Sequence, residues 1–361
     1  MQRDKVKVRL GGVSGTLLFP LWGRAQLSKE YSSLFYDAKA VELVEKILAS
    51  TIDYDISADD MLFGGVVFNI SRKGNLLPIF GLIALTAKQF DDKIKTYITE
   101  HPHASVVNIG AGLDATFYRV DNGSIHWYDL DLPAVIDVRK QLLPEPDRVT
   151  YIAKSLLDPS WCDDITYTED GIFMIAGGVL QYLEESEIKQ FFSMLADNFP
   201  DGEIVFTAMS RSDGGFKVWM DMFPPEQRYA IRTAWMDALK DWWEKAPQDQ
   251  KDMVNNMIAS LEIPTKPNGT DWVDLKAWWD QLSDTEKGEA VRDLLTPFCG
   301  GVGMWALEDA RKITKWDSRI TVIDQLSLFK NIPRDSLSAD MRRLVDYVDE
   351  SGGLNIFHLR V

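Results

Sequence analysis

Between residues 105 and 210, short runs rich in β-branched and aromatic residues alternate with helical patterns, and this alternation limits the possible folds more than any other feature of the chain. The runs SVVNIG, SIHWYDL, VTYIAKSL, GIFMIAGG and GEIVFTAMS predict strands. Helical patterns lie between them: LPAVIDVRKQLL has a proline near its first turn, and EESEIKQFFSMLADNF has apolar residues at helical spacing. The alternation predicts an α/β fold with a doubly wound parallel sheet, whose ligand lies at the carboxyl ends of the strands.

The rest of the chain divides around this unit. A length of 361 residues allows either one large domain with an insertion or two domains. We expect residues 1–100 to form a mostly helical cover. Residues 101–214 and 297–361 together should form the sheet, because RITVIDQLSLF and LNIFHLRV near the end add two strands and suit a seven-stranded fold. Residues 215–296 carry two patterns with tryptophans seven residues apart, which predict a helical insertion that covers the substrate.

Composition excludes several classes of partner. A formal net charge of -16 argues against nucleic acid, which requires a clustered basic face. No stretch approaches the roughly 18 apolar residues of a membrane span, and the first residues lack the apolar core of a secretory signal, so we expect a cytoplasmic protein without a membrane partner. The sequence does not specify an oligomeric state.

Cysteine and histidine show no metal-ligand spacing. Cys162 and Cys299 lie far apart, and we expect both to be buried thiols. The four histidines form no ligand pattern, so we expect no metal site. His126 lies in a strand-like run and is interpreted as a core histidine.

The glycine turn after the first strand is the main candidate site. Gly110, Gly112 and Ala115 satisfy the pattern G-x-G-x-x-G/A, and Asp129 and Asp131 follow about 20 residues on, where an acid would hydrogen-bond ribose hydroxyls. Glycine is needed where a side chain would strain a positive φ or block a ligand from the backbone. The pattern alone supports NAD and S-adenosylmethionine equally, and a turn without a ligand is the third reading.

Acidic residues around the turn favour the methyl donor. Asp114 stands where a pyrophosphate would approach, and repulsion between anions in a poorly solvated turn is costly. A cationic sulfonium tolerates the negative pocket formed by Asp114, Asp129 and Asp131. A helical region before the first strand is also typical of methyltransferases.

Several motifs, taken in order, resemble one family. VVNIGAGLDATFYRV, YDLDLPAVIDVRKQLL, DPSW and GVLQYL are similar to the leucine carboxyl methyltransferase family, particularly to a bacterial branch of polyketide O-methyltransferases. The resemblance extends to GVSGTLLFPLWGRA, KQFDD, ALEDARKITKWDSRI and IFHLRV, and so to most of the chain except the tryptophan-rich segment. It implies a class I S-adenosylmethionine-dependent methyltransferase with a Rossmann-like seven-stranded sheet.

The resemblance also implies roles for individual residues. Gly110 and Gly112 line the methionine portion of the cofactor, Asp131 holds the ribose and Asp129 takes the preceding acidic position. Leu156 and its neighbour Ser155 flank the adenine. Arg24 lies near the position of a basic residue for the cofactor carboxylate.

This chain departs from the family pattern at three cofactor positions. Thr86 and Lys88 stand where the branch has an arginine, and Lys88 offers a point charge without the arginine fork. Ser155 replaces an acid before Leu156. Gly177 replaces a glutamate expected near the cofactor's amino group. A charge-assisted hydrogen bond contributes about 1.5 to 3 kcal/mol, so two such losses lower cofactor affinity by orders of magnitude unless other groups compensate.

Three functions follow from these observations. The first is an S-adenosylmethionine-dependent O-methyltransferase acting on a carboxylate or hydroxyl of a small, largely apolar metabolite. The second is a non-catalytic or repurposed binding protein that keeps the methyltransferase fold with a degenerate cofactor site. The third and weakest is an NAD-dependent oxidoreductase. No catalytic base stands out, and Tyr182 after the fourth strand is a weak candidate for the substrate pocket.

Overall fold

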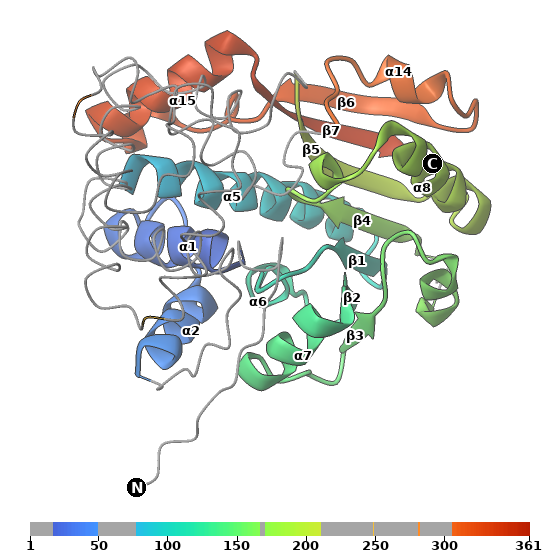
Figure 1. The fold of residues 1–361 in the computed structure, drawn as a ribbon, viewed down its shortest axis with the longest axis horizontal. Coiled ribbons are helices and arrows are strands. Elements are labelled where there is room, and N and C mark those ends of the chain that lie inside the picture. Colours follow the sequence, from blue (N-terminus) through green and yellow to red (C-terminus); the bar gives the residue numbers. More distant parts are fainter. Residues whose placement is uncertain (1–16, 50–76, 167–169, 211–247, 249–280, 282–304) are drawn as a thin grey trace, which may run out of the picture.

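A computed structural model describes residues 17–49, 77–166, 170–210 and 305–361, together with 248 and 281. Its centre is a seven-stranded sheet with the order β3-β2-β1-β4-β5-β7-β6 (Figure 1). The strands are β1 (Ser105–Ile109), β2 (His126–Asp131), β3 (Val149–Ala153), β4 (Ile172–Ala176), β5 (Glu203–Met209), β6 (Thr321–Ser327) and β7 (Leu354–Arg360). The predicted α/β class and the predicted strand in each of the seven runs are confirmed.

The order of the strands creates one switch point. β1 pairs in parallel with β2 on one side and with β4 on the other, so the chain reverses its direction of winding at β1. β2 and β3 are parallel, as are β4 and β5, whereas β7 is antiparallel to both β5 and β6. This is the sheet of the class I S-adenosylmethionine-dependent methyltransferase fold. Ligands of such sheets bind at the carboxyl ends of the strands beside the switch point.

Helices cover both faces of the sheet because successive strand residues point to opposite sides. Val106 belongs to one buried cluster, with residues of α5 and α15, and Val107 belongs to a second cluster, with residues of α8. Among the described residues, the helices that follow the first strand are α6 (Phe117–Val120), α7 (Pro133–Leu142), α8 (Glu185–Asn198), α14 (Arg311–Thr314) and α15 (Ala339–Ser351). Short 3₁₀ helices span Pro159–Asp164, Leu180–Tyr182 and Arg334–Ser336.

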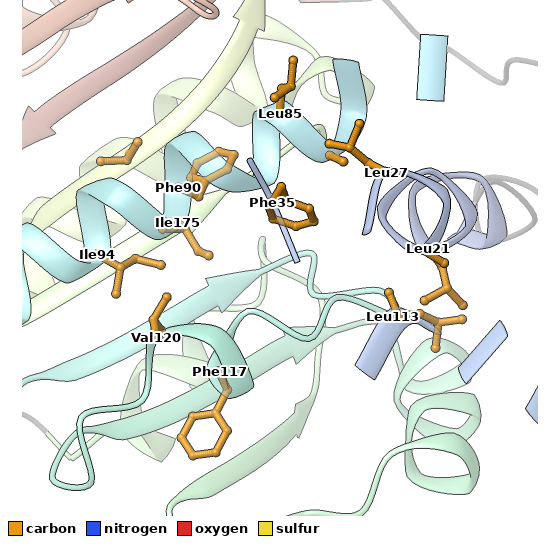
Figure 2. Close-up of a cluster of buried hydrophobic side chains, with 14 of the residues drawn as sticks. Leu21, Leu27, Phe35, Leu85, Phe90, Ile94, Leu113, Phe117, Val120 and Ile175 are labelled. Atoms are coloured by element: carbon orange, nitrogen blue, oxygen red, sulfur yellow. The ribbon is translucent and has the colours of Figure 1, made fainter. Parts of the chain in front are cut away.

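In the part of the chain that the structure describes, three helices precede the sheet: α1 (Leu18–Glu30), α2 (Ala38–Ala49) and α5 (Leu77–Glu100). In Figure 1 they are blue and cyan and lie together, with α1 and α5 in direct contact. Leu21 of α1, Phe90 of α5 and Leu113 after β1 belong to the same buried hydrophobic cluster (Figure 2). We call α1, α2 and α5 the helical cover. Burial of its apolar side chains fixes the cover against the beginning of the sheet.

The proposed domain boundaries remain predictions. The tryptophan-bearing patterns of residues 215–296 lie outside the described residues, apart from 248 and 281. Within the described helices, none is both long and apolar enough to cross a membrane.

The expectations for the two cysteines and for His126 have different outcomes. Cys162 is buried as predicted, and burial raises the pKa of its thiol to about 11. Cys299 lies outside the described residues. The interpretation of His126 as a core histidine is wrong, because it is the first residue of β2 and its side chain is exposed. Alternation along the strand places Trp127 inside instead.

Candidate cofactor site

The turn after β1 requires both of its glycines. Gly110 has φ 69° and Gly112 has φ 50°, in the left-handed region that favours glycine. A Cβ at Gly110 would lie 2.7 Å from the side chain of Val179, and a Cβ at Gly112 would lie 2.8 Å from that of Leu17. The turn therefore lies between the loop after β4 and the residue that precedes α1. Its position is the switch point of the sheet.

Asp131 joins the end of β2 to this turn. Its Oδ2 accepts a hydrogen bond of 2.7 Å from the backbone N–H of Gly112, and its Oδ1 accepts one of 2.7 Å from that of Leu132. Burial raises the pKa of the Asp131 carboxyl above its usual value. Each oxygen of a carboxylate can accept about two hydrogen bonds, so both retain capacity for a ligand. The structure thus brings together two of the predicted elements, the glycines and Asp131.

Asp129 lies beneath the turn and is completely buried. Its carboxylate accepts hydrogen bonds from Arg139 at 2.6 Å, from Trp127 Nε1 at 2.8 Å and from Asn108 at 3.1 Å. These partners enclose the group within the protein. The Asp129 side chain has no exposed surface in this structure, and a contribution of Asp129 to cofactor binding stays a prediction. Its effect on the site is to anchor Arg139.

Asp114 is also paired within the protein. Its Oδ1 lies 3.8 Å from Arg24 Nε and 3.6 Å from Arg119 Nη2, and its Oδ2 accepts a hydrogen bond of 3.1 Å from the backbone N–H of Thr116. Although burial opposes the charged form, these arginines lower the pKa of the Asp114 carboxyl to about 2. Because its charge is compensated, Asp114 does not repel an anion as the sequence analysis assumed.

Two arginines order the turn, because they donate hydrogen bonds to three successive backbone carbonyls. Arg139 Nη1 donates to the carbonyls of Gly112 at 3.0 Å and Asp114 at 2.7 Å, and Arg24 Nη2 donates to that of Leu113 at 2.9 Å. Arg24 is buried and also donates to Asp37 at 3.0 Å. Its location beside the turn agrees with the expected region, while a contact with the cofactor carboxylate stays a prediction.

The turn after β3 contains the two residues expected near the adenine. The hydroxyl of Ser155 accepts a hydrogen bond of 3.2 Å from the backbone N–H of Leu157, and the carbonyl of Leu156 accepts one of 3.1 Å from Trp161 Nε1. Leu156 is half-buried against the hydrophobic cluster of α8. Leu132, directly after Asp131, is 49% exposed. Leu132 was not predicted as a site residue. The sequence feature that could have identified it is an apolar side chain directly after Asp131, the residue proposed to bind the ribose.

The remaining candidates lie on α5 and after β4. Lys88 Nζ is 2.8 Å from Asp92 on the next turn of the same helix. Gly177 is exposed, and a Cβ there would lie 2.9 Å from the ring of Phe90. Tyr182 is half-buried in the 3₁₀ helix Leu180–Tyr182, and its backbone N–H donates to Val179. Val179 adjoins Gly110, so the Tyr182 segment borders the glycine turn.

Comparison with known proteins gives two curated relatives. Over 203 residues the chain is 28% identical to the tetracenomycin polyketide synthesis O-methyltransferase TcmP of Streptomyces glaucescens, covering 56% of this chain and 68% of the relative. Over 218 residues it is 24% identical to the S-adenosyl-L-methionine-dependent methyltransferase dpfgK of Gibberella zeae, covering 57% of this chain and 69% of that protein.

Among solved structures, the chain matches PKMT2 from Rickettsia typhi with a TM-score of 0.37 and 13% identity, over 74% of this chain. The chain spans about half the length of that protein, 51%.

The family match falls on the part of the chain that builds the candidate site. The model of the leucine carboxyl methyltransferase family covers residues 18–196, from the beginning of α1 to the last turns of α8. This segment contains the glycine turn, Asp131, the Ser155 turn and Tyr182. Over residues 18–196, the chain is therefore similar to the leucine carboxyl methyltransferase family.

Proposed function

We propose that this methyltransferase transfers the methyl group of S-adenosylmethionine to an oxygen atom, either a carboxylate or a hydroxyl, of a small and largely apolar metabolite. The printed name of the Streptomyces relative, a polyketide synthesis O-methyltransferase, supports an oxygen acceptor and a small molecule. The family match favours this function over the nicotinamide-dependent alternative. The single observation that carries the proposal is the hydrogen bond of 2.7 Å between Asp131 and Gly112.

The geometry around Asp131 fits the ribose of the cofactor. A vicinal diol presents two hydroxyl donors, and the carboxylate retains acceptor capacity on both oxygens. Leu132 and Leu156 would provide apolar surface for the adenine. The backbone at Gly110 and Gly112 would admit the methionine portion, since no side chain projects from either residue. Arg24 and Lys88 are the proposed cations for the cofactor carboxylate.

When bound, S-adenosylmethionine supplies an electrophilic methyl group on a sulfonium. Transfer of this group would form a carbon–oxygen bond as the carbon–sulfur bond breaks, and the electron pair of the broken bond would remain on sulfur. The chain's task is to align the acceptor oxygen, and such positioning can contribute about 7 to 11 kcal/mol. A carboxylate has no proton to lose, whereas a hydroxyl must pass its proton to a base. Tyr182 is the proposed residue of the substrate pocket. It follows Val179 by three residues, and the side chain of Val179 borders the glycine turn.

Two positions favour the second candidate, a repurposed binding protein. The Ser155 hydroxyl is engaged by Leu157, and the ring of Phe90 occupies the space into which a side chain at Gly177 would extend. These substitutions reduce the polar groups that we expected around the cofactor. The two candidates differ in whether product forms, so a transfer assay separates them.

The test uses methyl-labelled S-adenosylmethionine and a panel of apolar carboxylic acids and phenols, with products identified by mass spectrometry. An O-methyl product that requires the wild-type protein, and is lost in Asp131→Ala, supports the proposed function. Asp137→Asn is the matched control, because Asp137 is an exposed acid on α7 close to Asp131 in the chain. Saturable cofactor binding without any product across the panel would favour the binding protein, and methylation at nitrogen or carbon would refute the oxygen acceptor.

A further inference from the structure

One guanidinium joins the helical cover to the glycine turn. Arg119 lies in α6, four residues after Ala115 of the glycine turn, and only 7% of its side chain is exposed. Its Nε and Nη2 donate to the two oxygens of Asp91 on α5 at 2.7 and 2.9 Å. Its Nη1 donates to Asp37 at 2.5 Å, and its Nη2 also donates to the hydroxyl of Thr116 at 2.6 Å. Arg119 thus contacts α5, the start of α2 and the end of the turn.

Asp37 extends this network to the other two helices of the cover. Its Oδ1 accepts the backbone N–H of Ala40 at 2.8 Å at the beginning of α2, and its own N–H donates to the Ser28 hydroxyl of α1 at 2.8 Å. Its Oδ2 accepts a hydrogen bond from Nε of Arg24 in α1, and Nη2 of the same arginine donates to the carbonyl of Leu113. All three helices of the cover therefore reach the glycine turn through buried hydrogen bonds.

Removal of Arg119 would leave the buried carboxylate of Asp91 without its arginine partner, whereas Asp37 would keep Arg24. Only 7% of the Asp91 side chain and none of the Asp37 side chain is exposed. Among the described residues, Arg119 supplies both hydrogen bonds recorded for the Asp91 carboxylate. A buried charge that loses its partner is strongly destabilising, so the cover would separate from the turn to hydrate Asp91.

We propose that Arg119 is a positioning residue for the cofactor: it holds the cover against the glycine turn and thereby sets cofactor affinity without contacting the cofactor. The inference rests on the proposed function, since the turn is assigned there to the cofactor. Docking of the cover and binding of the cofactor both favour the same conformation of the glycine turn. Each event therefore strengthens the other by the same free energy. A ligand at the turn therefore strengthens the attachment of α1 and α2.

Arg119→Lys provides the test, because lysine keeps the charge but cannot form the fork with Asp91. The matched control is Arg334→Lys. Arg334 also binds two carboxylates, of Asp346 and Asp349, and two backbone carbonyls, and these partners lie outside the cover and the turn. Arg334 makes a similar number of hydrogen bonds but is more exposed, 27% against 7%, so its variant reports the general cost of replacing such an arginine away from the turn.

Each variant is measured in two ways. Calorimetric titration gives the Kd for S-adenosylhomocysteine, and hydrogen exchange of backbone amides is followed without ligand. For Arg119→Lys we expect the Kd to rise about tenfold or more and amides 110–116 to exchange about tenfold faster, with both within about twofold of wild type in Arg334→Lys. With an acceptor from the transfer assay, KM for the methyl donor should rise while kcat at saturation stays within about threefold. In the wild type, the ligand should slow exchange in α1 and α2.

Equal effects of the two lysine variants, or an unchanged Kd together with unchanged exchange in Arg119→Lys, would overturn the inference. If Arg119→Lys does not fold, Asp91→Asn removes the α5 end of the same interaction and is judged by the same readouts. Absence of ligand binding to the wild type would refute the proposed function. The exchange comparison, made without ligand, would then still decide whether Arg119 orders the turn.

Discussion

The backbone N–H of Gly112 lies 2.7 Å from Oδ2 of Asp131, and this hydrogen bond joins the turn after β1 to the end of β2. It orders an acid and a glycine 19 residues apart at the switch point of the sheet. Because the carboxylate keeps acceptor capacity, the same group can order the protein and receive a ribose.

Cofactor affinity should weaken at low pH through Asp131. Burial raises the folded-state pKa of this carboxyl, so it becomes protonated at a higher pH than an ordinary aspartate. Protonation removes acceptor capacity for hydroxyl donors, and the Kd for S-adenosylhomocysteine should rise as the pH is lowered towards the raised pKa of Asp131. Titration calorimetry of Asp131→Asn should show a flatter pH dependence, while Asp137→Asn should follow the wild type. An identical pH dependence in all three proteins would contradict this assignment.

Asp114 should stabilise the fold at neutral pH. Its folded pKa of about 2 lies below the unfolded value of 3.8, so its contribution is complete above about pH 4 and is lost as the pH falls towards 2. The shift corresponds to about 2 kcal/mol. Urea unfolding should show Asp114→Asn less stable than the wild type by about that amount at pH 7, with a smaller difference near pH 3. A difference that does not change with pH would show that the ion pairs are not its source.

Gly112→Ala should cost stability and cofactor affinity for two separate reasons. The positive φ of 50° strains any side chain, and the new Cβ would lie 2.8 Å from Leu17. Gly123→Ala is the control, since Gly123 has φ 85° and no atom within 4 Å of a Cβ. Thermal unfolding should show a cost of roughly 1 kcal/mol for the control and more for Gly112→Ala. Leu17→Ala in the Gly112→Ala background should recover part of the excess, and no recovery would place the clash elsewhere.

The fold was predictable because its signals are local. Each of the seven strands coincides with a short apolar run, and Pro133 marks the beginning of α7 as its preference for the first turn indicates. Side-chain roles were less predictable. Asp129 and Asp131 share one face of β2, so the strand period cannot distinguish them. Their depth does: Asp129 is enclosed between neighbouring strands with Arg139, whereas Asp131 stands at the strand's end.

The arginine network lay beyond sequence analysis for a related reason. Asp37, Asp91 and Arg119 are far apart in the chain, and only the packing of α5 and the start of α2 against the turn makes them partners. Nothing in the sequence near Arg119 distinguishes a buried fork from an exposed charge. Asp114 shows the same limit. Its acidic character alone predicted a group that repels anions, whereas in the structure two arginines compensate its charge.

Above all, we propose that Asp131 and the glycine turn hold S-adenosylmethionine. The decisive experiment is titration calorimetry of S-adenosylhomocysteine with wild type, Asp131→Ala and Asp137→Asn. Loss of two hydrogen bonds to a carboxylate predicts a Kd about 100-fold or more higher in Asp131→Ala, with saturable binding in the wild type and in Asp137→Asn within about twofold of each other. An undiminished affinity in Asp131→Ala, or no saturable binding to the wild type, would contradict the account.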